Sequence, residues 1–374
     1  MKIGLVCPYS INKHGGVLEV ILSLQDGLVQ RGHDVKIITP MPRGGNEDDH
    51  PDAIFIGNST DFRAPSHTTG QVSSITDNEK VDAILASENF DILHFHEPWV
   101  PLLSRQLLQR SHAINIGTFH SKIPETLMSR TYIKVVTPYL KSVMKYLQVL
   151  TAVSASGAEY AATLTDLPIT IIPNGIDLEK YHYRSATSKK KADKTVLYIG
   201  RLERRKGAKY LLRAFQLFSQ DNPDVKLLIA GDGPDREKLE LLAEDLKLKN
   251  VSFLGYISEE LKLQLLAEAD LFVSPAIFGE SFGIVLLEAM ATATVTIAGN
   301  NSGYADLMQG VGALSIINPE DTPEFARRLE LLMKENEIRK IWQKWAKQYV
   351  KQFSYPIVVD QYEALYKDSL KQYG

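Results

Sequence analysis

Two glutamates, Glu280 and Glu288, enclose the almost entirely apolar segment "GESFGIVLLE". Ser281 is expected to cap a helix here. The buried stripe of that helix has helical spacing and contains Phe282, Val285, Leu286 and Ala289. Glu280 then precedes the helix, and Glu288 lies two turns inside it, roughly 12 Å further along the axis. Between the carboxylates, the unpaired amides of the helix N-terminus can bind a phosphate group.

This spacing fits a nucleotide sugar, in which hydroxyls of the sugar and of the ribose flank a diphosphate. Carboxylates accept hydrogen bonds from hydroxyls, and the helix N-terminus favours the charge of the diphosphate. The alternative is that Glu280 caps the helix and Glu288 is a solvated surface acid, the commonest situation for a single glutamate. The spacing alone leaves both interpretations open.

A basic segment, "YIGRLERRKG", follows another predicted strand. Arg201 and Lys206 stand at the carboxyl end of that strand, where they can neutralise phosphate oxygens. Arg204 and Arg205 leave open the alternative of an ordinary solvated basic loop.

Glycines follow two of the predicted strands. Gly231 and Gly233 in "GDGP" let the backbone approach a ligand, although the segment matches neither a dinucleotide fingerprint nor a P-loop. Gly15 and Gly16 form either a tight turn or a place where backbone amides approach a phosphate.

His120 ends the strand "INIGTFH", where active sites of α/β proteins gather, although a histidine there is more often structural.

Two alternating series of strands and helices must position these residues. The strands of the first series are "KIGLVCP", "DVKIITP", "DILHFH", "INIGTFH", "VLTAVS" and "ITIIPNG". Those of the second are "TVLYIG", "VKLLIAG", "VSFLG", "LFVSPA" and "VTIAG". We therefore predict two doubly wound α/β domains, 1–182 and 195–352, a polar linker at 183–194 and a C-terminal helix at 353–374. Within residues 43–88, "RGGNEDDHPD" and "RAPSHTTGQ" are expected to be loops.

Composition excludes several classes of protein. The chain of 374 residues has a formal net charge of −3, which argues against nucleic-acid binding. Cys7 is the single cysteine, so no internal disulfide can form. No apolar run approaches the ~18–20 residues needed to span a bilayer, and the N-terminus is predicted to be a strand rather than a signal peptide. A cytoplasmic protein is expected, with peripheral attachment to the inner face of the membrane left open.

Taken in order, "GGV", "FH", "IPNGID", "GRLERRKG", "GDGP" and "ESFGIVLLEAMA" resemble the retaining glycosyltransferases of family 4. The resemblance covers nearly the whole chain, and its specific parts are the E-x7-E segment and the R-x4-K loop. It implies the GT-B fold, with two facing Rossmann-like domains, a cleft between them and C-terminal helices that cross back to the N-terminal domain. It also implies retention of the anomeric configuration.

Within the family, "DILHFHEPWVPLLS" and "GTFHS" are most similar to segments of the phosphatidylinositol mannosyltransferases. This implies GDP-mannose as donor and a lipid-linked or polyol acceptor such as phosphatidylinositol. By resemblance, Arg201 and Lys206 neutralise the diphosphate, Glu280 binds the donor sugar and Glu288 the ribose. His120 lies near the reacting sugar, and Tyr9 and Lys122 contact the inositol phosphate. The further donor-binding positions are Gly15, Gly16, Gly231, Gly233, Ile257, Ser281, Phe282, Gly283, Ile284 and Val285.

The sequence departs from that group in two places. Its R-x4-K loop is one residue shorter, which is closer to the general family. The basic helix used there for membrane contact is replaced by the acidic "TDNEKVDAILASENF", which an anionic membrane does not attract. A basic and aromatic segment at 121–148, with Lys122, Arg130, Lys134, Lys141 and Lys145, is either an interfacial helix or an ordinary half-buried one.

No pair of acids flanked by strands suggests a metal site, so we expect transfer that requires neither a metal ion nor a cofactor, with Arg201 and Lys206 supplying the positive charge. Three alternatives remain. They are a family 4 transferase that uses a UDP-sugar for cell-envelope glycan or glycolipid synthesis, a catalytically silent GT-B protein that binds a nucleotide or glycan, and a GT-B epimerase. An NAD-dependent enzyme is disfavoured because the glycine fingerprint is absent.

Overall fold

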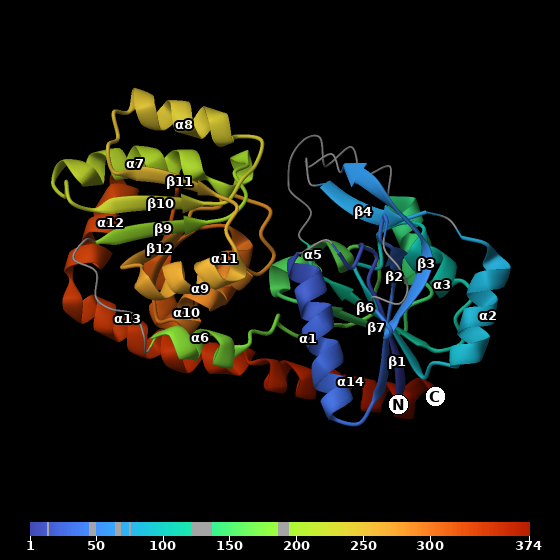
Figure 1. Ribbon diagram of the computed structural model, residues 1–374. Helices are drawn as coiled ribbons and strands as arrows, with labels where there is room; N and C mark the ends of the chain where they lie inside the picture. Colours follow the sequence, from blue (N-terminus) through green and yellow to red (C-terminus); the bar gives the residue numbers. More distant parts are fainter. Residues whose placement is uncertain (13–14, 45–49, 64–68, 75, 122–136, 186–193) are drawn as a thin grey trace. The chain divides into compact units, whose positions relative to one another are not determined.

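The structure is a computed structural model that describes residues 1–12, 15–44, 50–63, 69–74, 76–121, 137–185 and 194–374. The chain divides into two compact units. The first contains Met1–Gly175 together with Tyr355–Gly374, and the second contains Ile176–Ser354. Each unit is a parallel-stranded sheet with helices on both faces (Figure 1). The predicted α/β class is therefore confirmed.

The sheet of the first unit has the order β4-β3-β2-β1-β5-β6-β7-β8, and among its described strands β3 and β4 alone pair antiparallel. Its strands are β1 (Lys2–Val6), β2 (Asp34–Met41), β3 (Ala53–Arg63), β4 (Thr69–Ser73), β5 (Ile92–His96), β6 (Ile114–Phe119), β7 (Val149–Ala152) and β8 (Ile169–Ile171). Its helices are α1 (Gly16–Gln30), α2 (Asn78–Glu88), α3 (Leu103–Leu108), α5 (Ala155–Ala161) and α14 (Tyr355–Tyr373). The six predicted strands of this unit are all present.

The expectation of a loop at "RAPSHTTGQ" is wrong at both ends of that segment. Arg63 ends β3, and Thr69 begins β4, which pairs with β3 in the register Arg63↔Thr69. The backbone hydrogen bonds of β4 come from its pairing with β3. Because β4 is mostly polar and its apolar residues do not alternate, hydropathy alone does not detect this strand.

The second unit has the order β11-β10-β9-β12-β13-β14, which is the Rossmann order 3-2-1-4-5-6 when β9 is counted first. Its strands are β9 (Thr195–Ile199), β10 (Lys226–Ala230), β11 (Val251–Gly255), β12 (Leu271–Ser274), β13 (Val295–Gly299) and β14 (Ile316–Ile317). Its helices are α6 (Leu178–Ser185), α7 (Ala208–Gln220), α8 (Arg236–Asp245), α9 (Glu259–Glu268), α10 (Ile284–Ala291), α11 (Ser302–Leu307), α12 (Thr322–Lys334) and α13 (Asn336–Tyr349). Short 3-10 turns occupy Arg204–Lys206, Gly310–Ser315 and Val350–Phe353.

The first unit ends at Gly175, earlier than the predicted boundary at residue 182. Helix α6 packs against α9 and α10 and therefore belongs to the second unit. It continues to Ser185, so it includes the first residues of the predicted linker. Residues 186–193 of that linker lie outside the described part of the chain.

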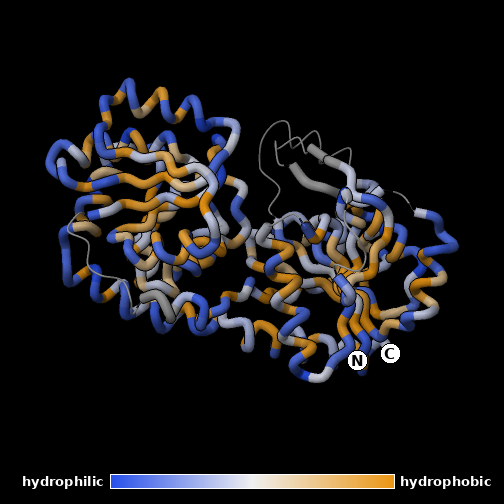
Figure 2. The backbone as a smooth tube through the Cα atoms, in the orientation of Figure 1, coloured by the Kyte–Doolittle hydropathy of each residue, from blue (hydrophilic) through white to orange (hydrophobic). Residues whose placement is uncertain are grey.

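Strand alternation and helix periodicity together build the cores. In the first unit, Ile3 and Leu5 face one side of the sheet, where they meet α1 and α14, and Val6 faces the other. Apolar residues of α1 recur at helical spacing at Leu18, Ile21, Leu24 and Leu28. Figure 2 shows hydrophobic residues concentrated along the strands and hydrophilic residues along the outer helices α2 and α8.

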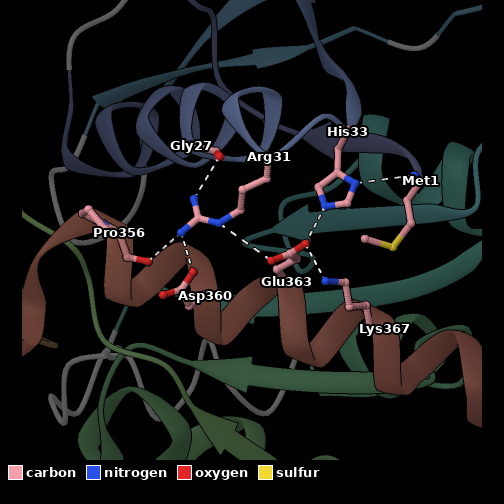
Figure 3. A network of polar contacts seen from close by, with 8 residues as sticks. All are labelled: Met1, Gly27, Arg31, His33, Pro356, Asp360, Glu363 and Lys367. Atoms are coloured by element: carbon pink, nitrogen blue, oxygen red, sulfur yellow. Dashed lines mark hydrogen bonds and ion pairs between the residues drawn. The ribbon is translucent and has the colours of Figure 1, made fainter.

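Helix α14 packs on α1 and β6 although it is last in the chain. Arg31 at the end of α1 contacts the Asp360 carboxylate and donates to the Pro356 carbonyl at 2.9 Å. His33 Nε2 lies 3.0 Å from Glu363 Oε1, and Lys367 Nζ lies 2.7 Å from the same oxygen (Figure 3). This polar network lies beside the apolar contact of the two helices.

Candidate functional site

In the second unit, the loops after β9 and β12 begin at neighbouring strands where the strand order reverses. Such a switch point is where ligands bind in open α/β sheets. The loop after β9 carries Arg201 and Lys206, and the loop after β12 carries Glu280. Lys206 Nζ lies 2.8 Å from Glu280 Oε1, so the fold brings these two predicted site residues together.

The Glu280 side chain is only 12 % exposed, which excludes the interpretation of an ordinary exposed capping acid. Burial raises the pKa of Glu280, but the charges of Lys206 and Arg205 outweigh burial and hold it below its usual value of 4.5. Glu280 is therefore ionised at neutral pH and able to accept hydrogen bonds from hydroxyls.

Arg205, which the sequence suggested was part of a solvated loop, is the second cation on Glu280. Its Nη1 lies 2.5 Å from Glu280 Oε1, and its Nη2 lies 2.8 Å from Glu203 Oε1. Arg201 instead is exposed and forms no ion pair with another described residue. No local signal distinguished Arg205 from Arg204, because the pairing joins residues from two different loops.

Helix α10 begins at Ile284, with Gly283 as N-cap, so the expectation that Ser281 caps it is wrong. Gly283 has φ 102°, and a Cβ there would lie 2.7 Å from the Tyr304 ring. Glu288 is therefore little more than one turn into the helix, and the estimated axial separation from Glu280 does not apply. Phe282 is buried and packs edge-to-face on Phe353.

Glu288 is buried rather than solvated, with 6 % of its side chain exposed. Its Oε1 lies 2.6 Å from Lys262 Nζ on α9 and accepts a hydrogen bond from the Tyr181 hydroxyl of α6 at 2.8 Å. Both contacts are to Oε1. Ile257 is half-buried in the loop before α9, which is the same helix that carries Lys262.

Gly231 and Gly233 approach protein backbone closely. A Cβ on Gly231, which has φ 131°, would lie 1.9 Å from the Gly200 carbonyl, and one on Gly233 would lie 2.4 Å from the Leu202 carbonyl. These contacts explain why both positions are glycine. They pack the loop after β10 against the loop that carries Arg201.

In the first unit, the predicted residues lie after β1 and β6. Gly15 is the N-cap of α1, with extended backbone and open space around its Cβ position, and Gly16 begins the helix. Tyr9 is half-buried after β1, and burial together with the nearby Glu97 raises its pKa well above 10. Lys122 lies outside the described residues, as do Arg130 and Lys134.

His120 lies directly after β6 and belongs to a buried cluster of histidines that sequence reasoning did not find. Its Nε2 lies 2.8 Å from His96 Nδ1. His94, two residues before His96 on the same face of β5, contacts the Tyr366 hydroxyl of α14 at 2.7 Å and the Thr118 hydroxyl at 2.6 Å. The alternation of histidines in "HFH" was the available signal.

Burial lowers the pKa of all three histidines, to about 3 for His94 and about 4 for His120. They are neutral at neutral pH. Glu97, directly after β5, has φ 52° and no exposed surface, and burial raises its pKa to about 7 although Ser121 donates a hydrogen bond to it. This site therefore carries little charge at neutral pH, where Glu97 is about half ionised.

Within the described part of the chain, no group of three or more His, Cys, Asp and Glu side chains is arranged to hold a metal ion. No helix among those residues combines the length and apolar character that crossing a bilayer requires.

Two family models match the chain. Residues 14–180 match the model described as Glycosyltransferase Family 4, and residues 180–349 match that described as Glycosyl transferases group 1. A phosphatidyl-myo-inositol mannosyltransferase of Mycolicibacterium smegmatis is 29% identical over 98% of this chain and 94% of its own length. The protein of the same name from Propionibacterium freudenreichii is 31% identical over 82% of this chain and 79% of its own length.

Solved structures show the same fold. Sucrose-phosphate synthase from Thermosynechococcus elongatus superposes with a TM-score of 0.77 at 20% identity over 99% of both chains. Anabaena HepE, solved in complex with UDP and glucose, has a TM-score of 0.71 at 19% identity over 99% of this chain and 100% of its own. The chain therefore belongs to glycosyltransferase family 4 and has the GT-B fold.

Proposed function

We propose that this glycosyltransferase moves mannose from GDP-mannose to phosphatidylinositol or a related lipid-linked or polyol acceptor. The observation that carries the proposal is the buried, ionised Glu280 beside Lys206 at the switch point of the second unit. The names of the relatives favour mannose and an inositol lipid. We further propose that the protein is cytoplasmic and attaches peripherally to the inner face of the membrane.

In the proposed mechanism, Arg201 and Lys206 bind the diphosphate together with the amides that begin α10. Glu280 accepts a hydrogen bond from a hydroxyl of the donor sugar. Glu288 accepts one from the ribose through Oε2, since its two side-chain contacts are to Oε1. No metal ion is required, because the two cations stabilise the departing diphosphate.

We infer retention by front-face attack. The acceptor oxygen forms the new bond to the anomeric carbon on the face from which the diphosphate leaves. The hydroxyl proton passes to the departing phosphate oxygen, so no protein base is needed. His120, held neutral by burial, can hydrogen-bond the reacting groups without adding charge.

The test is thermal stabilisation by GDP, UDP, ADP and their sugar conjugates. A ligand at ~100 times its dissociation constant adds roughly 2.7 kcal/mol to the free energy of unfolding. We expect GDP and GDP-mannose to stabilise the wild type and the Arg204→Ala control, but not Arg201→Ala or Glu288→Ala. Binding of no nucleotide at millimolar concentration overturns the catalytic proposal and favours a silent binding protein.

A UDP-sugar donor is the second candidate, since HepE of the same fold was solved with UDP and glucose. Stabilisation by UDP but not GDP would select it and leave the family unchanged. Transfer assays with phosphatidylinositol vesicles and with free inositol then separate a lipid from a polyol acceptor. Undiminished turnover in EDTA is expected for a metal-independent reaction.

A further inference from the structure

Arg205 links the two loops that flank the switch point of the second unit. Its Nη1 lies 2.5 Å from Glu280 Oε1 and donates to the Gly279 carbonyl at 3.3 Å, while its Nη2 lies 2.8 Å from Glu203 Oε1. Its carbonyl accepts a hydrogen bond from the Ile277 amide at 2.8 Å. The guanidinium is thus held by groups from both loops.

Lys206, the next residue, is held much less firmly. Among the described residues, the side chain of Lys206 contacts Glu280 alone, through the 2.8 Å ion pair with Oε1. A flexible lysine stem can leave this oxygen more easily than a planar guanidinium that is fixed by two hydrogen-bond acceptors and an ion pair with Glu203. Both cations contact Oε1 of Glu280, and no described residue forms a recorded hydrogen bond with Oε2.

We propose that Arg205 is a positioning residue that fixes the Glu280 carboxylate while Lys206 transfers from Glu280 to the diphosphate of the arriving donor. This inference rests on the proposed function, because it assumes that Glu280 receives a sugar hydroxyl. When the donor binds, Glu280 thus loses its contact with Lys206 and gains a hydrogen bond from a hydroxyl of the donor sugar. Arg205 keeps Oε2 of Glu280 directed at that hydroxyl.

The charge balance around Glu280 supports this division. The groups that face it are Lys206 and Arg205 from the loop after β9, Tyr198 of β9 and Tyr304 of α11. Both tyrosines are buried, and their pKa values are raised, so they are neutral. Once Lys206 binds phosphate, Arg205 is the cation among the described residues that still offsets the effect of burial on the pKa of Glu280.

The experiment compares Arg205→Gln, Arg205→Lys and the matched control Arg204→Gln, which changes an exposed arginine one residue away. We measure kcat and the donor KM from pH 5 to 9, together with thermal stabilisation by the nucleoside diphosphate alone. For Arg205→Gln, we expect kcat to fall about 10- to 100-fold. The acid limb of the pH profile should move to higher pH, because Glu280 then protonates more easily.

Arg205→Lys should restore part of the acid limb, since it keeps the charge, and Arg204→Gln should match the wild type. Stabilisation by the diphosphate should persist in all three variants and shows that they are folded. An unchanged acid limb in Arg205→Gln overturns the proposal. If Arg205→Gln loses diphosphate binding as severely as Arg201→Ala, the proposal is also overturned, because Arg205 would then be a phosphate ligand. Absence of both binding and turnover in the wild type instead overturns the proposed function.

Discussion

At the carboxyl end of the sheet in the first unit, three buried histidines with lowered pKa values lie beside Glu97, whose pKa is raised to about 7. At the corresponding end of the second sheet, Lys206 and Arg205 converge on Glu280, whose pKa is lowered. In the second unit the two loops follow β9 and β12, between which the strand order reverses, whereas the histidine cluster lies at the ends of β5 and β6, beside the reversal between β1 and β5. Burial suppresses charge in the first site, and ion pairing preserves it in the second.

Sheet topology therefore determines the edge of the sheet at which a site forms, whereas the residues at that edge determine its chemistry. A diphosphate needs fixed positive charge. Imidazoles with lowered pKa values are weak bases, so His94 and His120 would compete little for the proton that the proposed acceptor hydroxyl gives to the leaving phosphate.

The largest effect is expected from the charged site. Lys206→Ala removes the mobile cation and should lower kcat/KM by about 10²–10³-fold, as the loss of a transition-state charge partner does. Arg205 still pairs with Glu280, so the unfolding midpoint should change little. Lys180→Ala, which removes a cation paired with Glu259 on α9, is the control. Equal losses in the two variants would contradict a specific role of Lys206.

The next largest effect is expected on stability, where the loops after β9 and β10 pack closely at Gly231. Gly231→Ala places a Cβ against the Gly200 carbonyl at a φ that alanine rarely adopts. We expect a loss of about 2–3 kcal/mol in the free energy of unfolding, measured with urea. A variant as stable as the wild type would show that the loops after β9 and β10 do not pack as described.

Lowering the pH should weaken the first unit before the second. The pKa values of His94 and His120 lie below the ordinary 6.5, so the unfolded chain takes up protons first and stability falls below about pH 6.5. The loss is on the order of 1 kcal/mol per pH unit for each histidine. Glu97 acts oppositely: its contribution is complete below pH 4.5 and is lost as the pH rises through about 7.

Glu280 has a lowered pKa, so its contribution to the second unit is present above pH 4.5 and is lost only as the pH falls below that value. Hydrogen exchange at pH 7.5, 6 and 5, resolved by peptide, compares the two units directly. Peptides of β5 and β6 should lose protection before those of β9 and β12. The reverse order would show that the histidines are not neutral in the folded state.

The smallest effect on stability is expected at Gly15. Its backbone is extended and its Cβ position is open, so Gly15→Ala should change the free energy of unfolding by no more than about 0.5 kcal/mol. The donor KM should nevertheless rise, since a methyl group would obstruct the proposed approach to the phosphate. An unchanged KM would remove Gly15 from the donor site.

Much of the architecture could be predicted from local patterns. The apolar runs "KIGLVCP" and "TVLYIG" identified β1 and β9, because buried parallel strands need continuous apolar residues whatever surrounds them. Strand β4 was missed because it is polar, β3 was missed although it begins with the apolar "AIFI", and the start of α10 was placed too early. Gly283 has a left-handed φ, so the helical conformation cannot extend back from Ile284 to Ser281.

The sequence by itself determined most of the strand and helix series, the position of His120 at a strand end and of Glu280 before a helix, and the family to which these motifs belong. Only the tertiary structure decided the partners of these residues. Arg205 and Glu280 are 75 residues apart, Lys262 and Glu288 are 26 apart, and His94 and Tyr366 are 272 apart. Periodicity and capping act within a few turns, whereas burial and ion pairing depend on what the fold brings close. Burial and ion pairing set the charge of each site.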